Sequence, residues 1–312
     1  MAYPSSSVVY WFRRRFGISE VRREKLVLTM TRFREISSAV VHHRMGGIGV
    51  AILAFFVTMA LVAPLLPLPY WDASLFPSFQ DPSWAHPFGT DQNGRDILAR
   101  VVWGSRVSLL VGFLASVIAG VLGTLVGLVA GFWTGWRDEV LMRINDILLS
   151  LPWLALLIVL AQILGGQLSL SVIILTIGLT SWNFTARVVR AQVLSVKERV
   201  FVERARASGA SGITILRKHI FPNVFPLVFA NTILTVAVAI LSESTLAFLG
   251  KVQVGTLSWG VILHEAEASS AIINGHWAWI VMPGLSLVTV ILGFSLLGYA
   301  LDEILNPKLR ER

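Results

Sequence analysis

Six long apolar blocks constrain how this chain can fold more than any other feature of its sequence. They lie near residues 47–68, 107–132, 140–164, 168–189, 224–249 and 278–301. A helix of about 20 apolar residues crosses the hydrocarbon core of a bilayer, and only helices and closed barrels satisfy every backbone polar group there. Charged residues make up only 14% of the chain, whereas an average soluble domain has about 25%. The pattern predicts an all-α polytopic membrane protein with six transmembrane helices.

The distribution of positive charge predicts the orientation of these helices. If both chain termini lie in the cytoplasm, the inner segments carry 22 of the 26 Lys and Arg residues. An excess of Lys and Arg in short loops marks the cytoplasmic side of a membrane protein. The net charge of +8 then follows from topology, and no nucleic-acid partner is expected. The first apolar block is long enough to remain in the membrane, so no cleaved signal peptide is expected.

The segments outside the core have their own composition. Residues 1–46 are basic, and apolar side chains recur at helical spacing over residues 20–45, which predicts an amphipathic helix on the inner leaflet. This helix either orients the first span, at 47–68, or contacts a partner. The extracytoplasmic segment 69–105 is rich in aromatic residues, which suit either the membrane interface or contact with a solute or receptor. Residues 304–312 form a cytoplasmic tail.

Residues 106–303 are predicted to form a core with five transmembrane helices. Its first helix carries small residues every four positions, and tight backbone contact drives helices together in lipid. We therefore expect this helix in the middle of the bundle or at a subunit interface. The small residues are Gly112, Ala115, Ser116, Ala119, Gly120, Gly123, Gly127 and Gly131.

Two acidic residues in apolar surroundings are candidates for the pathway or its gate. Asp146 precedes the apolar run of the third block and stands three residues after Arg143, so the two can pair on one helical face. They either tie neighbouring loops together at headgroup level or line the gate. Glu243 lies toward the outer end of the fifth block. Ionisable residues within spans are functional candidates, and Glu243 either caps a helix end, binds a partner's cation or faces the pathway.

A polar, basic insert, residues 197–223, separates the fourth and fifth blocks. It is predicted to contain one helix over 197–208 and a second over 211–219, which ends before Pro222. Gly209 and Gly212 allow the turn between them, and the hydroxyl of Ser211 caps the second helix by accepting a bond from a free amide. A helix–turn–helix in a cytoplasmic loop offers a docking surface.

This insert resembles the EAA loop of ABC-importer permeases. Glu203, Ala205, Gly209, Ile220 and Pro222 match the loop at the right spacing, while Arg204 replaces its first alanine. Further segments are similar in order to permeases of the dipeptide, oligopeptide and nickel type, of the C kind. They begin at His86–Asp96 and Gly104–Leu110, and they include Gly131–Trp136, Met142–Leu148, Ala186–Arg190, Val196–Arg199, Glu243–Gly250, Ser258–Gly260, Pro283–Gly284 and Leu305–Pro307.

The resemblance implies the transmembrane domain of a type I ABC importer. Its expected partners are a second homologous permease in a heterodimer, two ABC ATPases and an extracytoplasmic solute-binding protein. The expected solute is a dipeptide or oligopeptide, with oligosaccharides or nickel as alternatives. The loop is expected to couple the chain to the ATPases, which carry ATP and Mg, while this chain binds no cofactor and no metal. The expected coupling residues are Glu203, Ala205, Gly209, Ser211, Ile213, Leu216, Arg217, His219, Ile220 and Pro222.

Two other function classes are weighed against the importer subunit. The sequence contains no Gly-x-x-x-x-Gly-Lys-Ser/Thr loop, so ATP hydrolysis is expected from partners and the chain is expected to be non-catalytic. An ion-coupled secondary transporter requires intramembrane acids or broken helices at matching places in two halves. An intramembrane enzyme requires a motif such as His-Glu-x-x-His or Gly-x-Ser-x-Gly, and the sequence has neither.

Overall fold

The computed structural model describes residue 31 and residues 34–305, and within them the regular elements are all helical. Of the expected amphipathic helix over 20–45, residues 34–42 are helical, and most of the remainder, like residues 306–312 of the tail, lies outside the described residues. The principal helices are α3 (Arg44–Val62), α4 (Ile97–Phe132), α5 (Trp136–Ser150), α6 (Trp153–Ile163), α7 (Leu170–Thr180), α8 (Asn183–Lys197), α9 (Val200–Ala207), α10 (Gly212–Ile215), α11 (Phe221–Phe248), α12 (Trp259–Ala268) and α13 (Ala278–Leu305).

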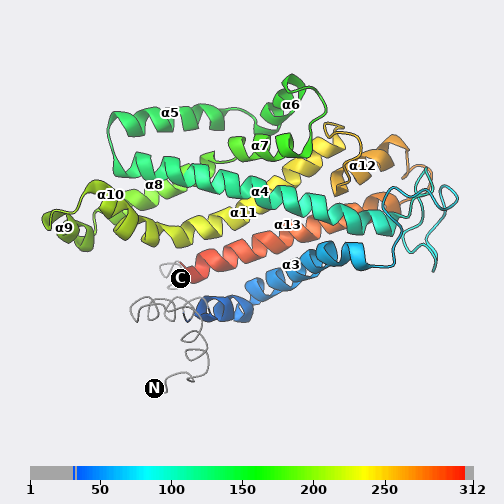
Figure 1. The fold of residues 1–312 in the computed structure, drawn as a ribbon, viewed down its shortest axis with the longest axis horizontal. Helices are drawn as coiled ribbons and strands as arrows, with labels where there is room; N and C mark the ends of the chain where they lie inside the picture. Colours follow the sequence, from blue (N-terminus) through cyan, green and yellow to red (C-terminus); the bar gives the residue numbers. More distant parts are fainter. Residues whose placement is uncertain (1–30, 32–33, 306–312) are drawn as a thin grey trace, which may run out of the picture.

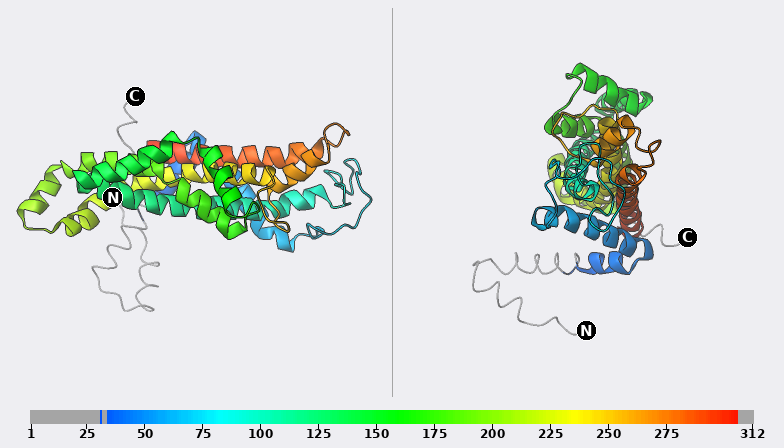
Figure 2. Two further views of the ribbon diagram at one scale, coloured as in Figure 1. Left: turned by 90° about the horizontal axis from the view of Figure 1, so that it is seen from above. Right: turned by 90° about the vertical axis from the view of Figure 1, so that its right-hand side faces the viewer.

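The long helices run side by side along one axis of an elongated bundle (Figures 1 and 2). The hairpin of α9 and α10 stands at one end, and α12 lies at the other end together with the connection between α3 and α4 (Figure 1). The start of α3 and the end of α13 both face the α9–α10 end (Figure 1), so between these two points the chain passes along the bundle an even number of times. Five helices in the described residues are long and apolar enough to span a membrane, or six if α5 and α6 form one broken span.

The third block, counted among the six expected spans, is not one continuous helix. Two helices replace it, α5 and α6, and they meet at an angle of 90°. Pro152 causes the break, because proline has no amide hydrogen and its ring clashes with the preceding turn. The residue before a proline is also driven out of the helical region, and Leu151 accordingly has extended backbone angles, φ −81° and ψ 135°.

The second and fourth apolar blocks form helices whose bounds differ from those of the blocks. α7 and α8 together cover the fourth block, with a short break at residues 181–182, and α8 continues to Lys197. The helix of the second block, α4, begins ten residues before the apolar block does, at Ile97. Asp96 determines this start, because its carboxylate accepts a bond of 2.8 Å from the amide of Ala99 and so caps a free helical amide.

Small residues place α4 in the centre of the bundle, where it packs along α7, α8 and α11. A Cβ atom on Gly127 would lie 2.6 Å from the carbonyl oxygen of Ala186, and one on Gly112 would lie 2.3 Å from a side-chain carbon of Ile240. The missing side chains therefore let α8 and α11 approach α4 closely, which is how helices associate in lipid. The expectation of close packing along this stripe is confirmed within the chain.

The aromatic connection between α3 and α4 packs in part against the end of the helix bundle. Trp71 and Phe88 contact a buried cluster built around Trp259 and Trp279, whereas the side chain of Trp84 is fully exposed. The connection is thus attached to the end of the bundle near α12, and it contributes to the core there.

Candidate functional site

The turn between α9 and α10 has the geometry that its sequence predicts. The amide of Ala210 donates to the carbonyl of Ala205 at 3.1 Å, and the amide of Gly209 donates to that of Arg206 at 3.0 Å. These two bonds form a Schellman motif, which ends a helix at a residue in the left-handed region. Gly209 has a φ of +78°, a conformation that glycine adopts at no steric cost.

The second helix of the insert begins as expected but does not end at Pro222. The hydroxyl of Ser211 accepts a bond of 3.4 Å from the amide of Thr214, which caps α10. α10 then continues through a π-helical turn, Leu216–Ile220, directly into α11. In this wider turn the amide of Phe221 donates to the carbonyl of Leu216. The turn thus brings Pro222, which has no amide hydrogen to donate, into the first turn of α11, where proline is tolerated.

One face of the insert packs on its own chain. Val202 of α9, Ile215 of α10 and Ile220 are buried in a cluster with Val193 and Val196 of α8. The expectation that Ile220 belongs to the outer coupling surface is therefore not met in this chain, because its side chain is completely covered. Leu216 is partly buried against the same cluster. These contacts hold the α9–α10 hairpin against the ends of α8 and α11.

The opposite face of the insert is open and mostly basic. The side chain of Ile213 is 62% exposed, and the insert carries four exposed cations. Those cations are Arg204, Arg206, Arg217 and Lys218. Among the expected coupling residues, Glu203, Gly209, Ser211, Ile213, Arg217 and Pro222 are exposed, Ala205, Leu216 and His219 are half-buried, and Ile220 is buried.

Asp146 does not pair with Arg143. Its carboxylate lies 2.5 Å from the guanidinium of Arg187 on α8, while Arg143 lies 4.0 Å from Glu139. About two helical turns earlier on α5, Asp138 accepts two bonds of 2.6 Å from Arg190. Both pairs connect α5 to α8. The structure therefore places Asp146 in an ion pair between two helices. It leaves both alternatives open, the tie between loops and the gate.

Glu243 is enclosed by its own chain. Its side chain is 1% exposed, and one carboxylate oxygen accepts bonds from the hydroxyls of Ser244, at 3.2 Å, and Ser108, at 3.4 Å. The hydroxyl of Ser108 in turn accepts a bond of 3.3 Å from the amide of Trp259 in the first turn of α12. Glu243 thus links α11 to α4 and, through Ser108, to the first turn of α12.

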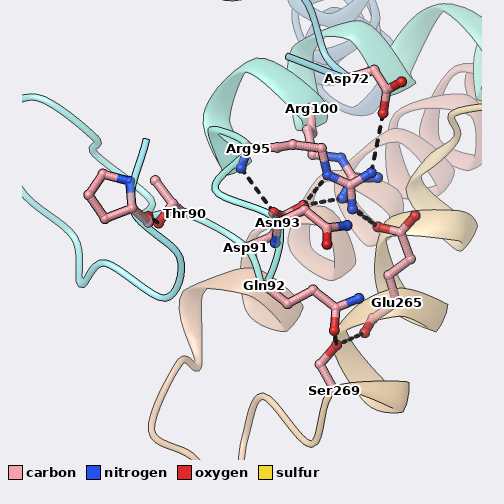
Figure 3. A network of polar contacts seen from close by, with 10 residues as sticks. Asp72, Thr90, Asp91, Gln92, Asn93, Arg95, Arg100, Glu265 and Ser269 are labelled. Atoms are coloured by element: carbon pink, nitrogen blue, oxygen red, sulfur yellow. Dashed lines mark hydrogen bonds and ion pairs between the residues drawn. The ribbon is translucent and has the colours of Figure 1, made fainter. Parts of the chain in front are cut away.

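A buried ionic cluster at the α12 end was not anticipated from the sequence (Figure 3). The guanidinium groups of Arg95 and Arg100 share the carboxylates of Asp91 and Glu265, with four contacts between 2.5 and 2.7 Å. Arg95 also lies 3.5 Å from Asp72. Arg95 and Glu265 are 170 residues apart, so no local pattern predicts their pairing. The only signal in the sequence is the presence of two arginines, Arg95 and Arg100, just before the second apolar block.

This cluster attaches the connection between α3 and α4 to α12. Burial by itself would lower the pKa of Arg95, but the carboxylates of Glu265 and Asp91 outweigh burial and raise that pKa above its ordinary value. Arg95 therefore keeps its charge at every physiological pH. Removing one partner from such a cluster leaves an uncompensated buried charge, which is strongly destabilising. The geometry indicates a structural clamp.

Comparison with known proteins agrees with this architecture. The family described as "Binding-protein-dependent transport system inner membrane component" matches residues 123–311. The chain belongs to this family. The resemblance stated from the EAA loop is thereby confirmed, and the chain is a multi-pass membrane permease subunit of an ABC importer.

Several curated relatives extend the similarity over nearly the whole permease. The dipeptide transport system permease protein DppC of Bacillus subtilis is 35% identical over 292 residues, which cover 93% of this chain and 89% of the relative. A putative peptide transport system permease protein of Brucella abortus is 34% identical and covers 95% of this chain and 96% of the relative.

A solved structure is similar in fold. The MetNI methionine ABC transporter, in inward-facing conformations, contains a chain that matches with a TM-score of 0.52 and 21% identity. The match covers 68% of the permease and 95% of that chain. At this identity the likeness establishes the fold, which is that of a type I ABC importer transmembrane domain.

Proposed function

We propose that this permease pairs with a second, homologous permease to form the pathway for uptake of a dipeptide or oligopeptide. An extracytoplasmic solute-binding protein delivers the peptide, and two ABC ATPases supply the energy. The permease itself binds no cofactor, while ATP and Mg reside on the ATPases. The peptide class is supported by relatives that are named as dipeptide and peptide permeases.

The observation that carries the coupling role is the mechanical continuity between the insert and the bundle. α10 passes into α11 through a π-helical turn and without a loop, and the hairpin is packed on α8 through Val202, Ile215 and Ile220. A force on the exposed face, which carries Glu203, Ile213 and Arg217, therefore reaches two spanning helices at once. ATP-driven movement of a docked ATPase would tilt these helices as rigid bodies, as alternating access requires.

The orientation follows from the same proposal. The basic α9–α10 end faces the cytoplasm, as the positive-inside rule requires, and both chain termini lie on that side. The end that carries α12 and the ionic cluster then faces the binding protein. Glu265 and Arg95 hold this outer surface in one shape.

Co-purification is the direct test. The permease, tagged at its C-terminus, is purified in detergent from native membranes, and its partners are identified by mass spectrometry. A second permease together with one or two ATPases is the expected result, followed by ATP-dependent peptide uptake when the complex and its binding protein are reconstituted. Recovery of the permease alone, without nucleotide-stimulated activity, would overturn the proposal and favour an ion-coupled secondary transporter.

A further inference from the structure

A cavity of about 280 Å³ lies where the two broken helices of the bundle meet. One wall is the 90° bend between α5 and α6, and a second wall is the break between α7 and α8. The third wall is a stretch of α11. The residues that line the cavity are Leu148, Leu149, Leu151, Trp153, Thr180, Ser181, Asn183, Phe184, Asn231, Leu234, Thr235 and Val238.

The cavity lies halfway along the bundle. Leu234 and Thr235, which line it, are the two central residues of α11, Phe221–Phe248. Both α6 and α8 begin at this depth, at Trp153 and Asn183, and neither helix start has a side-chain cap. Broken helices at membrane depth occur where the backbone is buried in protein or lines a cavity. In secondary transporters, breaks near the midplane form the solute site.

Polar atoms without partners gather at this point. Among the described residues, eight shielded side-chain nitrogen and oxygen atoms have no hydrogen-bond partner, and three of them belong to cavity residues. These three are Nε1 of Trp153, Oγ of Ser181 and Oδ1 of Asn183, and two more belong to Asn145, which stands one helical turn from Leu148 on α5. A shielded polar group without a partner is costly, so this concentration demands a physical reason.

Other polar side chains around the cavity are satisfied. Thr180 donates to the carbonyl of Thr176 at 2.7 Å, and Thr235 donates to that of Asn231 at 2.9 Å. The side-chain amide of Asn231 donates to the hydroxyl of Thr185 at 2.7 Å. The three unpaired atoms of the cavity residues therefore comprise one donor, Nε1 of Trp153, and one acceptor, Oδ1 of Asn183. The third, the hydroxyl of Ser181, can act as either.

We propose that this cavity is a mid-membrane binding site that recognises the peptide groups of the transported solute. A peptide group offers one N–H donor and one C=O acceptor, which complement Asn183 and Trp153. No charged residue lines the cavity, so it is suited to neutral backbone and apolar side chains, and it has no ligand set for a nickel ion. The polar atoms are covered in the present conformation, and side-chain rotation during transport would turn them toward the solute. This inference rests on the proposed function.

The first test uses variants of the reconstituted importer. Asn183→Leu and Trp153→Phe are expected to lower peptide uptake at low concentration by about three- to tenfold, the value of one neutral hydrogen bond, and to leave the maximal rate less affected. Thr235→Val is the matched control, because its hydroxyl lines the same cavity but is already paired. The proposal would be overturned if peptide uptake depended on peptide concentration in the same way in the wild type and all three variants.

The second test locates the solute directly. The chain contains no cysteine, so Ser181→Cys introduces a single thiol in this subunit. During ATP turnover a transported peptide is expected to protect it from a small maleimide, while Ala51→Cys, in a separate cavity between α3, α4 and α13, is not protected. Protection by an oligosaccharide instead of a peptide would overturn the peptide assignment, and a thiol that is unreactive in every state of the assembled importer would mean that the second permease fills the cavity.

The two proposals fail in distinguishable ways. Loss of ATP-dependent peptide uptake in the wild-type importer contradicts the proposed function. Normal wild-type uptake together with unaffected Asn183 and Trp153 variants contradicts only the cavity site.

Discussion

Individual residues in this permease hold its two ends in shape by different means. At the α12 end, Arg100 is 1% exposed and lies 2.7 Å from Asp91 and 2.5 Å from Glu265. At the α9–α10 end, Gly209 allows the turn with a φ of +78°. The first is an electrostatic requirement and the second is a conformational one, so substitutions at the two positions should have different consequences.

Arg100→Leu is expected to destabilise the purified permease by about 3–5 kcal/mol, because it leaves buried carboxylates with one cation fewer. Arg106→Leu, two turns further along α4, is the matched control. Arg106 is exposed and stacks over the ring of Trp103 at 5.4 Å, an interaction worth about 0.5–1 kcal/mol. Thermal unfolding in detergent measures both, and equal melting temperatures would contradict the clamp.

Gly209→Val is expected to impair ATP-driven uptake while leaving membrane insertion intact. A Cβ on Gly209 meets no atom within 4 Å, so the cost is backbone strain alone, about 1–2 kcal/mol. Gly209→Asn is the control, since asparagine tolerates the left-handed region. Uptake and ATP hydrolysis are measured on the same preparation. The same ratio of uptake to ATP hydrolysis in both variants would show that coupling does not require the left-handed turn at Gly209.

Glu203→Lys tests the exposed face of the same hairpin. The side chain of Glu203 is exposed and stands among cations, so charge reversal should weaken ATPase docking without loss of folding. Glu139→Lys, an exposed acid on α5 outside the insert, serves as the control. Co-purification of the ATPase with each variant is the measurement, and undiminished recovery with Glu203→Lys would remove Glu203 from the coupling surface.

At the scale of helices, the centre of the bundle depends on how closely α4 approaches its neighbours. Gly127→Ala would place a methyl group 2.6 Å from the carbonyl oxygen of Ala186 and 2.7 Å from Cβ of Val189. Such overpacking costs about 1–3 kcal/mol. Gly284→Ala on α13 is the same change in open space, where the nearest atom is 4.0 Å away. Size-exclusion profiles of heated samples should separate the variants, and matching profiles would contradict close packing as the basis of the α4 position.

At the scale of the whole molecule, the start of α3 and the end of α13 lie toward the same end of the bundle. In the proposed orientation, Ala207→Cys in α9 faces the cytoplasm and Ala85→Cys faces outward, and both residues are exposed. A membrane-impermeant maleimide applied to intact cells should label Ala85→Cys alone, and permeabilised cells should show both labelled. Labelling of Ala207→Cys in intact cells would reverse the orientation.

Much of the architecture was predictable because it depends on neighbours within a few residues. The apolar blocks indicate the spans, Gly209 and Ser211 end one helix and begin the next, and the small residues of α4 mark its buried stripe. The effects of the two prolines were not predicted. Pro152 breaks a helix, whereas Pro222 is accommodated by the π-helical turn, and the two outcomes differ because of what surrounds each proline.

By itself the sequence determined the membrane-spanning class, the family and the local form of the insert, since periodicity, turn geometry and short motifs are local properties. Tertiary structure alone decided which distant groups meet. It joined Arg95 to Glu265 across 170 residues, turned Ile220 toward α8 and away from the outer surface, enclosed Glu243, and brought the breaks near Pro152 and Ser181 around one cavity. These contacts depend on the angle and depth at which helices pack, and such quantities are set by the whole bundle.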